Sequence, residues 1–161
     1  MDEAANWQQR IDSLWMTFDH QPSPDFLAAM KTLVAERPPN DALALFEYGS
    51  ALDSTGYPQA AVENYRRALA LDLPSQRRRR ATIQMASSLR NLGHAEEGVL
   101  LLSGELDRMS DDLDDAVRAF LSLCLTSIGR EREAVSVALT ALAPHLSRYN
   151  RSLAAYASKL V

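Results

Sequence analysis

The sequence predicts an all-α protein in which about nine helices form consecutive antiparallel hairpins. Alanine and leucine, both strong helix formers, recur along the 161 residues. Most of the six glycines and seven prolines fall between segments of helical periodicity, where they end helices. The sequence has no Asn-Gly or Asp-Gly pair and no sustained alternation of apolar and polar residues, so nothing in it predicts a β-hairpin or a strand.

Two helices are predicted before residue 40. The second is expected to begin with Ser23 as its N-cap and Pro24 as its first helical residue, and to end at Pro38-Pro39. We expect this pair, residues 1–39, to cap one end of the core as a degenerate hairpin. The first helix, over residues 4–18, carries an amphipathic stripe of Trp7, Ile11, Leu14, Trp15 and Phe18.

Three helix pairs follow as predicted repeats, over residues 41–74, 75–110 and 111–144. In the first pair, Asn40 is expected to cap a helix that runs to about Ser54, and Tyr57-Pro58 opens the partner helix, which runs to about Leu71. The other predicted helices cover residues 75–92 and 95–108 in the second repeat, and in the third run from Ser110 or Asp111 to residue 128 and over 131–143.

The last predicted helix, over residues 146–160, caps the other end of the chain within residues 145–161. We expect one face to pack on the third repeat and the opposite face, with Ala155, to stay in contact with water. The apolar face consists of Leu146, Tyr149, Leu153, Tyr156 and Leu160.

An internal repeat is marked by three glycines, Gly56, Gly93 and Gly129, which lie 37 and 36 residues apart. Five positions after each of them comes a small residue followed by valine. Because only a small side chain fits where two helices cross closely, we expect these residues to lie at helix crossings. They are Ala61, Gly98 and Ala134.

The first repeat resembles the tetratricopeptide repeat, with Leu45, Tyr48, Gly49 and Leu52 in one helix and Ala61, Tyr65, Ala68 and Pro74 in the next. The second repeat departs from that motif, because Gly98 and Glu105 stand where alanine is usual. Residues 46–142 are similar to the bacterial family called tetratricopeptide repeat group 5. The resemblance implies a right-handed solenoid of stacked hairpins in a cytoplasmic protein, and no particular activity.

Composition argues against several classes of function. With 17 basic and 21 acidic side chains, the net charge is −4 and the chain lacks the basic excess of a nucleic-acid-binding protein. Cys124 is the single cysteine, so an internal disulfide is excluded, and we interpret it as a small buried side chain. No signal-peptide pattern and no apolar run long enough for a membrane helix is found, so we expect a cytoplasmic protein without membrane contact.

No phosphate loop, dinucleotide turn, zincin helix or nucleophile elbow occurs, so we expect a protein that is not an enzyme and needs no cofactor or metal. The acidic cluster of Asp111, Asp112, Asp114 and Asp115 is interpreted as complementing a helix dipole rather than binding a cation. The run from Arg77 to Arg80 is interpreted as a solvated turn, with contact to phosphate or an acidic partner as the alternative.

The resemblance implies that the first helix of each hairpin lines a concave groove. The side chains expected to contact a partner there are Phe46, Ser50, Arg80, Gln84, Ser87, Asn91, Phe120 and Leu123. Along the chain this set changes from mixed polar through donor-rich to apolar, and it suits a peptide with an acidic or amide-bearing middle and an apolar end. The alternative is that the chain's own segments cover Phe120 and Leu123.

We therefore expect a non-catalytic protein–protein interaction module that binds a peptide or helix in its groove. Two alternatives stay open at this point. One is a self-assembling structural homodimer that associates through Trp7 and Trp15, and the other is a regulatory or accessory domain that responds to a small ligand. The sequence does not identify the protein partner.

Overall fold

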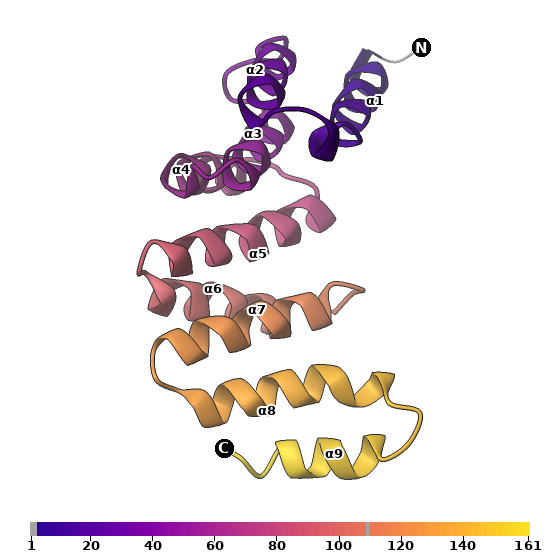
Figure 1. Cartoon of the computed structure of the whole chain (residues 1–161), viewed down its shortest axis with the longest axis vertical. Coiled ribbons are helices and arrows are strands. Elements are labelled where there is room, and N and C mark those ends of the chain that lie inside the picture. The colour runs from indigo at the N-terminus through magenta and orange to yellow at the C-terminus, as the bar shows by residue number, and fades with distance from the viewer. Residues whose placement is uncertain (1–2, 109) are drawn as a thin grey trace. The chain divides into compact units, whose positions relative to one another are not determined.

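The computed structural model describes residues 3–108 and 110–161 (Figure 1). This part of the chain forms nine α-helices and two short 3-10 helices and contains no strand, which confirms the all-α prediction. The α-helices are α1 (Glu3–Trp15), α2 (Ser23–Val34), α3 (Ala42–Ser54), α4 (Pro58–Leu69), α5 (Ser75–Asn91), α6 (Ala95–Arg108), α7 (Asp114–Ser127), α8 (Glu131–Leu142) and α9 (Asn150–Ala157). The 3-10 helices are η1 (Phe18–His20) and η2 (Ala143–His145).

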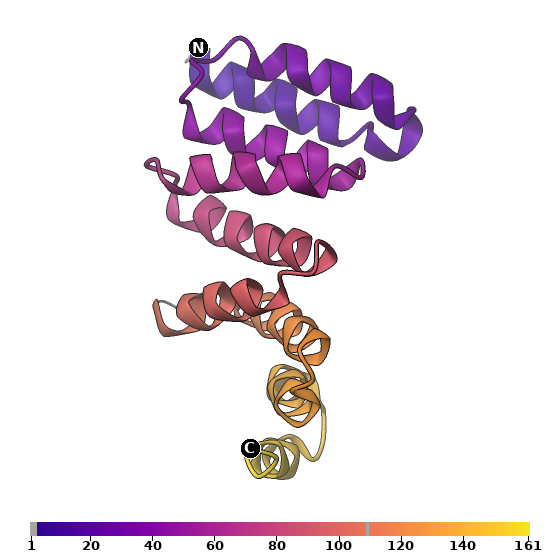
Figure 2. The same cartoon turned by 90° about the vertical axis from the view of Figure 1, so that its left-hand side faces the viewer.

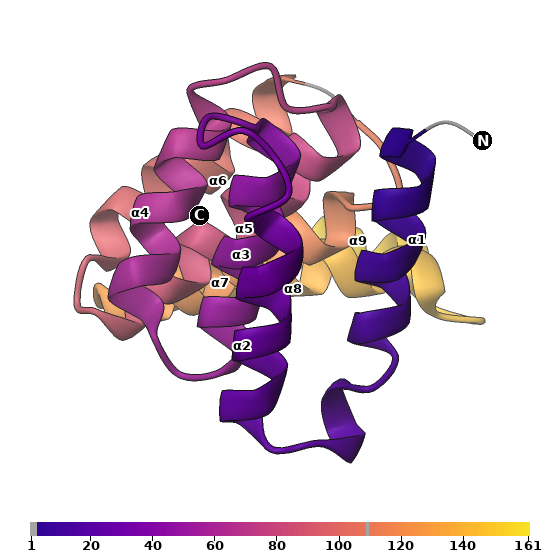
Figure 3. The same cartoon turned by 90° about the horizontal axis from the view of Figure 1, so that it is seen from above.

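The chain divides into two compact units, unit 1 up to Ala81 and unit 2 from Thr82 onward, and the division falls within α5. In unit 1, α1 packs on α2, α2 on α3 and α3 on α4, each helix antiparallel to the one before (Figure 2). Viewed from above, α1 and α2 lie side by side and are joined through η1 (Figure 3). In unit 2, α6 packs on α7, α7 on α8 and α8 on α9. The grouping of all 161 residues into one domain with three repeats stays a prediction.

The core of unit 1 forms where α1, α2 and α3 meet. The inward stripe predicted for the first helix is confirmed at Trp7 and Ile11, both of which are buried. The indole Nε1 of Trp7 donates a hydrogen bond to the carbonyl of Leu33 over 2.9 Å, so this polar group is satisfied where its ring is buried. Buried residues of this core are Trp7, Ile11, Phe26, Met30, Ala44 and Ala51.

Two predicted helix caps are wrong by one residue. The N-cap of α2 is Pro22, and Ser23 is already helical. The N-cap of α3 is Asp41 rather than Asn40, and its carboxylate accepts a hydrogen bond from the Ala44 amide over 2.9 Å. Both neighbouring residues can cap, and the choice depends on which backbone is extended at the helix start.

The three repeat glycines end helices α3, α5 and α7 in the same way. Their φ values are +89° at Gly56, +86° at Gly93 and +76° at Gly129, which only glycine adopts without strain. After each glycine the next amide donates back to the residue five positions earlier, as in the bond from Tyr57 to Leu52 of 2.8 Å. A repeated helix stop of this kind explains the spacing seen in the sequence.

The small residues after the glycines are all buried, as expected for positions at helix crossings. Ala61 and Ala134 are buried, and Gly98 in α6 is buried against α5 and α7. A Cβ atom at Gly98 would lie 2.8 Å from the Sγ of Cys124 and 3.3 Å from the carbonyl oxygen of Ala86. Gly98 therefore replaces the usual alanine because the cysteine sulfur occupies the space of a methyl group.

Helix α7 begins later than the sequence suggests, at Asp114 instead of Ser110 or Asp111. The carboxylate of Asp111 accepts a hydrogen bond from the amide of Leu113 over 2.8 Å. Such a local side-chain-to-backbone bond offers the chain a turn in place of a first helical turn.

Helix α9 is shorter than predicted, and its predicted apolar face packs only in part: Leu146, Leu153 and Leu160 are half-buried. Tyr149 and Tyr156, expected to face inward, are 77% and 66% exposed, whereas Ala157 is buried. The hydroxyl of Ser136 in α8 donates to the carbonyl of Ala157 over 2.8 Å, so α9 approaches α8 closely at small residues. That close approach leaves no space for tyrosine rings between the two helices.

Candidate partner-binding surfaces

The predicted partner-binding residues divide between the two units. Phe46, Ser50 and Arg80 belong to unit 1, and the other five belong to unit 2.

In unit 1, only Arg80 of the predicted set is exposed. Phe46 is fully buried and Ser50 is buried, so neither presents its side chain to a partner. The guanidinium carbon of Arg80 lies 5.3 Å from the ring centroid of Phe46. The ring centroids of Phe46 and Tyr65 are 6.4 Å apart. The Arg80 guanidinium therefore packs over the buried Phe46 ring, and Phe46 itself does not belong to the exposed surface.

In unit 2, the end of α5 and helix α7 are adjacent. The Sγ of Cys124 lies 3.9 Å from the carbonyl oxygen of Ala86, and both residues belong to the buried core of this unit. On α5, Ser87 is half-buried and Asn91 is exposed, with its side-chain oxygen accepting a hydrogen bond from Arg90. Gln84, also on α5, is half-buried.

The apolar part of the predicted surface lies on α7. Phe120 is partly buried and packs against the core of unit 2, while Leu123 is 46% exposed. Residues three apart on a helix are neighbours on one face, so these two side chains lie on the same side of α7. Within unit 2, the described residues leave the Leu123 side chain open to solvent.

The arginine run at the start of α5 is only partly a solvated turn. Arg79 is fully buried, so the solvated interpretation is wrong for this residue. Arg77 places its Nε 3.9 Å from a carboxylate oxygen of Glu47, while Arg80 remains exposed. Four consecutive helical residues point in all directions around the axis, so at least one of them must face the packed side.

Glu47 of α3 is a buried carboxylate that sequence reasoning missed. Its Oε2 accepts a hydrogen bond of 2.9 Å from the indole Nε1 of Trp15, and only 5% of the residue is exposed. Burial raises the pKa of the Glu47 carboxyl above its ordinary value, while the Trp15 hydrogen bond and the charges of Arg77 and Arg80 act in the opposite direction. In the sequence Glu47 stands among apolar residues of the first repeat, and this position is the signal that could have indicated its burial.

We expect Glu47→Gln to become more stable relative to the native chain as pH rises from about 4 to about 7. Because the pKa of Glu47 is raised in the folded state, its contribution to the free energy of unfolding is complete at pH values below the pKa of the unfolded chain. That contribution is lost as pH rises through the pKa of the folded state. Glutamine stays neutral and still offers an oxygen to Trp15. Urea denaturation of both proteins at the two pH values measures the difference, and an equal difference at both would contradict the assignment.

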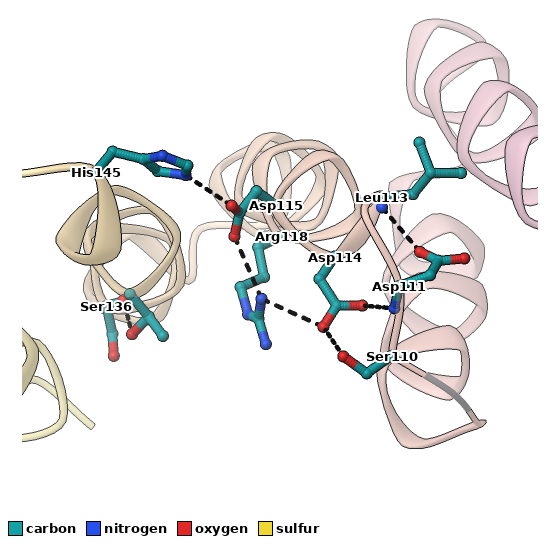
Figure 4. Close-up of polar contacts among 9 residues, drawn as sticks. Ser110, Asp111, Leu113, Asp114, Asp115, Arg118, Ser136 and His145 are labelled. Atoms are coloured by element: carbon teal, nitrogen blue, oxygen red, sulfur yellow. Dashed lines mark hydrogen bonds and ion pairs between the residues drawn. The ribbon is translucent and has the colours of Figure 1, made fainter.

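Three of the four aspartates in the acidic cluster, Asp111, Asp114 and Asp115, contact the protein's own groups (Figure 4). Arg118 lies 3.8 Å from Asp114 and 3.4 Å from Asp115, and the Nε2 of His145 lies 2.8 Å from Asp115. Asp114 also accepts a hydrogen bond from the hydroxyl of Ser110 over 2.7 Å. Asp114 and Asp115 lie in the first turn of α7, where negative charge is favourable, which supports the interpretation as helix stabilisation.

The tryptophans proposed for a homodimer contact pack within unit 1. Trp7 is 4% exposed, and Trp15 is half-buried with its indole bonded to Glu47. Neither ring forms an exposed apolar end surface, so the homodimer hypothesis loses the contact on which it was based.

Comparison with known proteins gives one family match. The model of tetratricopeptide repeat group 5, described as "Tetratrico peptide repeat", matches residues 42–160. No curated protein and no solved structure matches the chain significantly. Among the described residues, no helix combines the length and apolar character needed to span a membrane.

Proposed function

Because the chain belongs to the tetratricopeptide repeat family, we propose that it is a non-catalytic module that binds a peptide or helix of a protein partner. Domains of this family are generally protein–protein interaction modules and usually act as scaffolds without catalysis. Protein partners are therefore the general expectation for the fold.

The exposed Leu123 beside Phe120 on α7 is the observation that carries the proposal. A large apolar side chain on an open helix face suits an apolar anchor of a partner, since burial of such groups dominates the energy of protein interfaces. The neighbouring α5 supplies Ser87 and Asn91, whose polar groups can bond to a peptide backbone or amide. The proposed partner surface of unit 2 thus combines an apolar part on α7 with polar groups on α5.

We expect Leu123→Asp to weaken partner binding by about tenfold or more, because it places an unpaired charge in the apolar part of the surface. The partner is first captured from the host on the native chain and identified, and its affinity for each variant is then measured by calorimetry. Surface substitutions of this kind shift the free energy of unfolding by less than about 0.5 kcal/mol, so Leu123→Asp should fold.

Leu142→Asp is a matched control, since Leu142 on α8 is 47% exposed, almost the same as Leu123. This variant should bind the captured partner like the native chain. Equal losses from the two substitutions, or full affinity in Leu123→Asp, would remove the α7 surface from the proposal.

A further inference from the structure

A cleft lies wholly within unit 1, where the end of α2 and the loop after it meet α3 and α4. Its volume is about 510 Å³, enough for a few large side chains. It shares no residue with the predicted partner surface. The lining residues that matter for its chemistry are Lys31, Val34, Leu45, Tyr48, Asn64 and Arg67.

The loop that forms one wall of the cleft is held at several points. Arg37 donates two hydrogen bonds to a carboxylate oxygen of Asp41, over 2.9 and 2.6 Å, and Asp41 also caps α3. Arg67 of α4 donates to the carbonyl oxygen of Pro39 over 3.0 Å. Two consecutive prolines restrict the same loop further. The cleft is therefore formed before any ligand arrives, which lowers the entropic cost of binding.

The charge of the cleft is positive although the chain as a whole is negative. Among the residues that the structure describes, no aspartate or glutamate lines it. Arg37 is neutralised by Asp41, whereas Lys31 is exposed and has no acidic partner within the described part of the chain. The guanidinium of Arg67 bonds a backbone carbonyl, which leaves its charge uncompensated. Two cations thus stand at the edge of the cleft.

The base of the cleft is apolar. Leu45 is buried there, and Val34 and Tyr48 are half-buried around it. Asn64 uses its amide nitrogen on the carbonyl of Ala60, so its amide oxygen remains available to a peptide N–H. An apolar base with two cations at the edge is complementary to a large apolar side chain next to carboxylates.

We propose that this cleft binds an acidic segment of a protein partner, in which one large apolar side chain enters the cleft and adjacent carboxylates contact Lys31 and Arg67. The proposal goes beyond the surface on α7 and does not depend on it. An apolar base suits a large side chain better than it suits a phosphodiester backbone, which has no apolar group to place there.

The experiment uses a fluorescein-labelled hexapeptide with a central leucine–phenylalanine pair and two glutamates on each side. Binding to the full chain is followed by fluorescence anisotropy. The chain has two lysines, Lys31 and Lys159, so a carbodiimide that joins amines to nearby carboxylates identifies the contact by mass spectrometry. We expect the peptide to be joined to Lys31 and not to Lys159.

Lys31→Glu should weaken peptide binding by about tenfold or more, because it replaces attraction with like-charge repulsion. Lys31 is exposed and unpaired in the described structure, so its replacement should leave the melting temperature almost unchanged. Lys159→Glu makes the same charge change at another exposed lysine and should bind like the native chain. Leu123→Asp should also retain peptide binding, which separates this site from the surface on α7.

Four results would overturn the proposal. They are absence of peptide binding to the native chain, equal affinity for a peptide with glutamine in place of every glutamate, equal loss in Lys31→Glu and Lys159→Glu, and tighter binding of single-stranded oligothymidine that displaces the peptide.

Discussion

Gly98→Ala is expected to lower the free energy of unfolding by about 1–3 kcal/mol. Alanine is the better helix former by about 1 kcal/mol, so a loss of stability can only come from packing. The new Cβ would lie 2.8 Å from the Sγ of Cys124, which is fully buried, and 3.3 Å from the backbone oxygen of Ala86. Urea denaturation followed by circular dichroism measures the change. Circular dichroism is preferred to tryptophan fluorescence because both tryptophans lie in unit 1, whereas Gly98 lies in unit 2.

Gly104→Ala on the same helix is the matched control. A Cβ at Gly104 meets no atom within 4 Å, so this substitution should instead stabilise the protein, by up to about 1 kcal/mol. Combining Gly98→Ala with Cys124→Ala removes the sulfur, and we expect a coupling of about 1–2 kcal/mol between the two sites. Equal effects at Gly98 and Gly104, or strict additivity with Cys124→Ala, would show that the sulfur does not determine the glycine.

Phe26→Ala is expected to cost about 3–5 kcal/mol of unfolding free energy, the largest effect we predict. Phe26 of α2 is fully buried, and its ring centroid lies 5.0 Å from that of Trp15 and 4.8 Å from that of Phe18. Removing the ring leaves a cavity and breaks both aromatic contacts, which carry some energy beyond area burial.

Tryptophan fluorescence during urea denaturation reports on this change directly, because Trp15 is one of the two aromatic partners of Phe26. Tyr156→Ala, at a ring that is 66% exposed, should change stability by less than about 0.5 kcal/mol. A loss below about 1 kcal/mol for Phe26→Ala would mean that α1 and α2 contribute little to the stability of unit 1.

Local features of the chain could be predicted well. Residues 95–108 form α6 as predicted, since a glycine stop before the helix and a periodic apolar pattern within it act over a few residues. The repeat spacing is equally local in origin, because Gly56, Gly93 and Gly129 each adopt a positive φ that ends a helix.

The assignment of these residues to a partner surface stays a prediction. Leu123 is exposed, whereas the repeat position of Phe46 predicts an exposed groove residue and the structure buries this ring against Arg80. The cleft with Lys31 and Arg67 was not anticipated at all, since its walls come from α2, α3, α4 and a loop. No pattern within one helix reports which side chains from several segments meet around one cavity.

Periodicity, helix stops and the small residues at crossings were sufficient to specify an all-α chain of repeated hairpins. These signals act within one helix or one turn, so they can be recognised in the sequence without knowledge of which residues of a neighbouring helix pack against them. Tertiary packing alone decided the burial of Arg79 and Glu47, the outward direction of Tyr149 and Tyr156, and the need for glycine at position 98. Each of these depends on the exact distance between neighbouring helices, and a difference of one methyl group there changes which side chain fits.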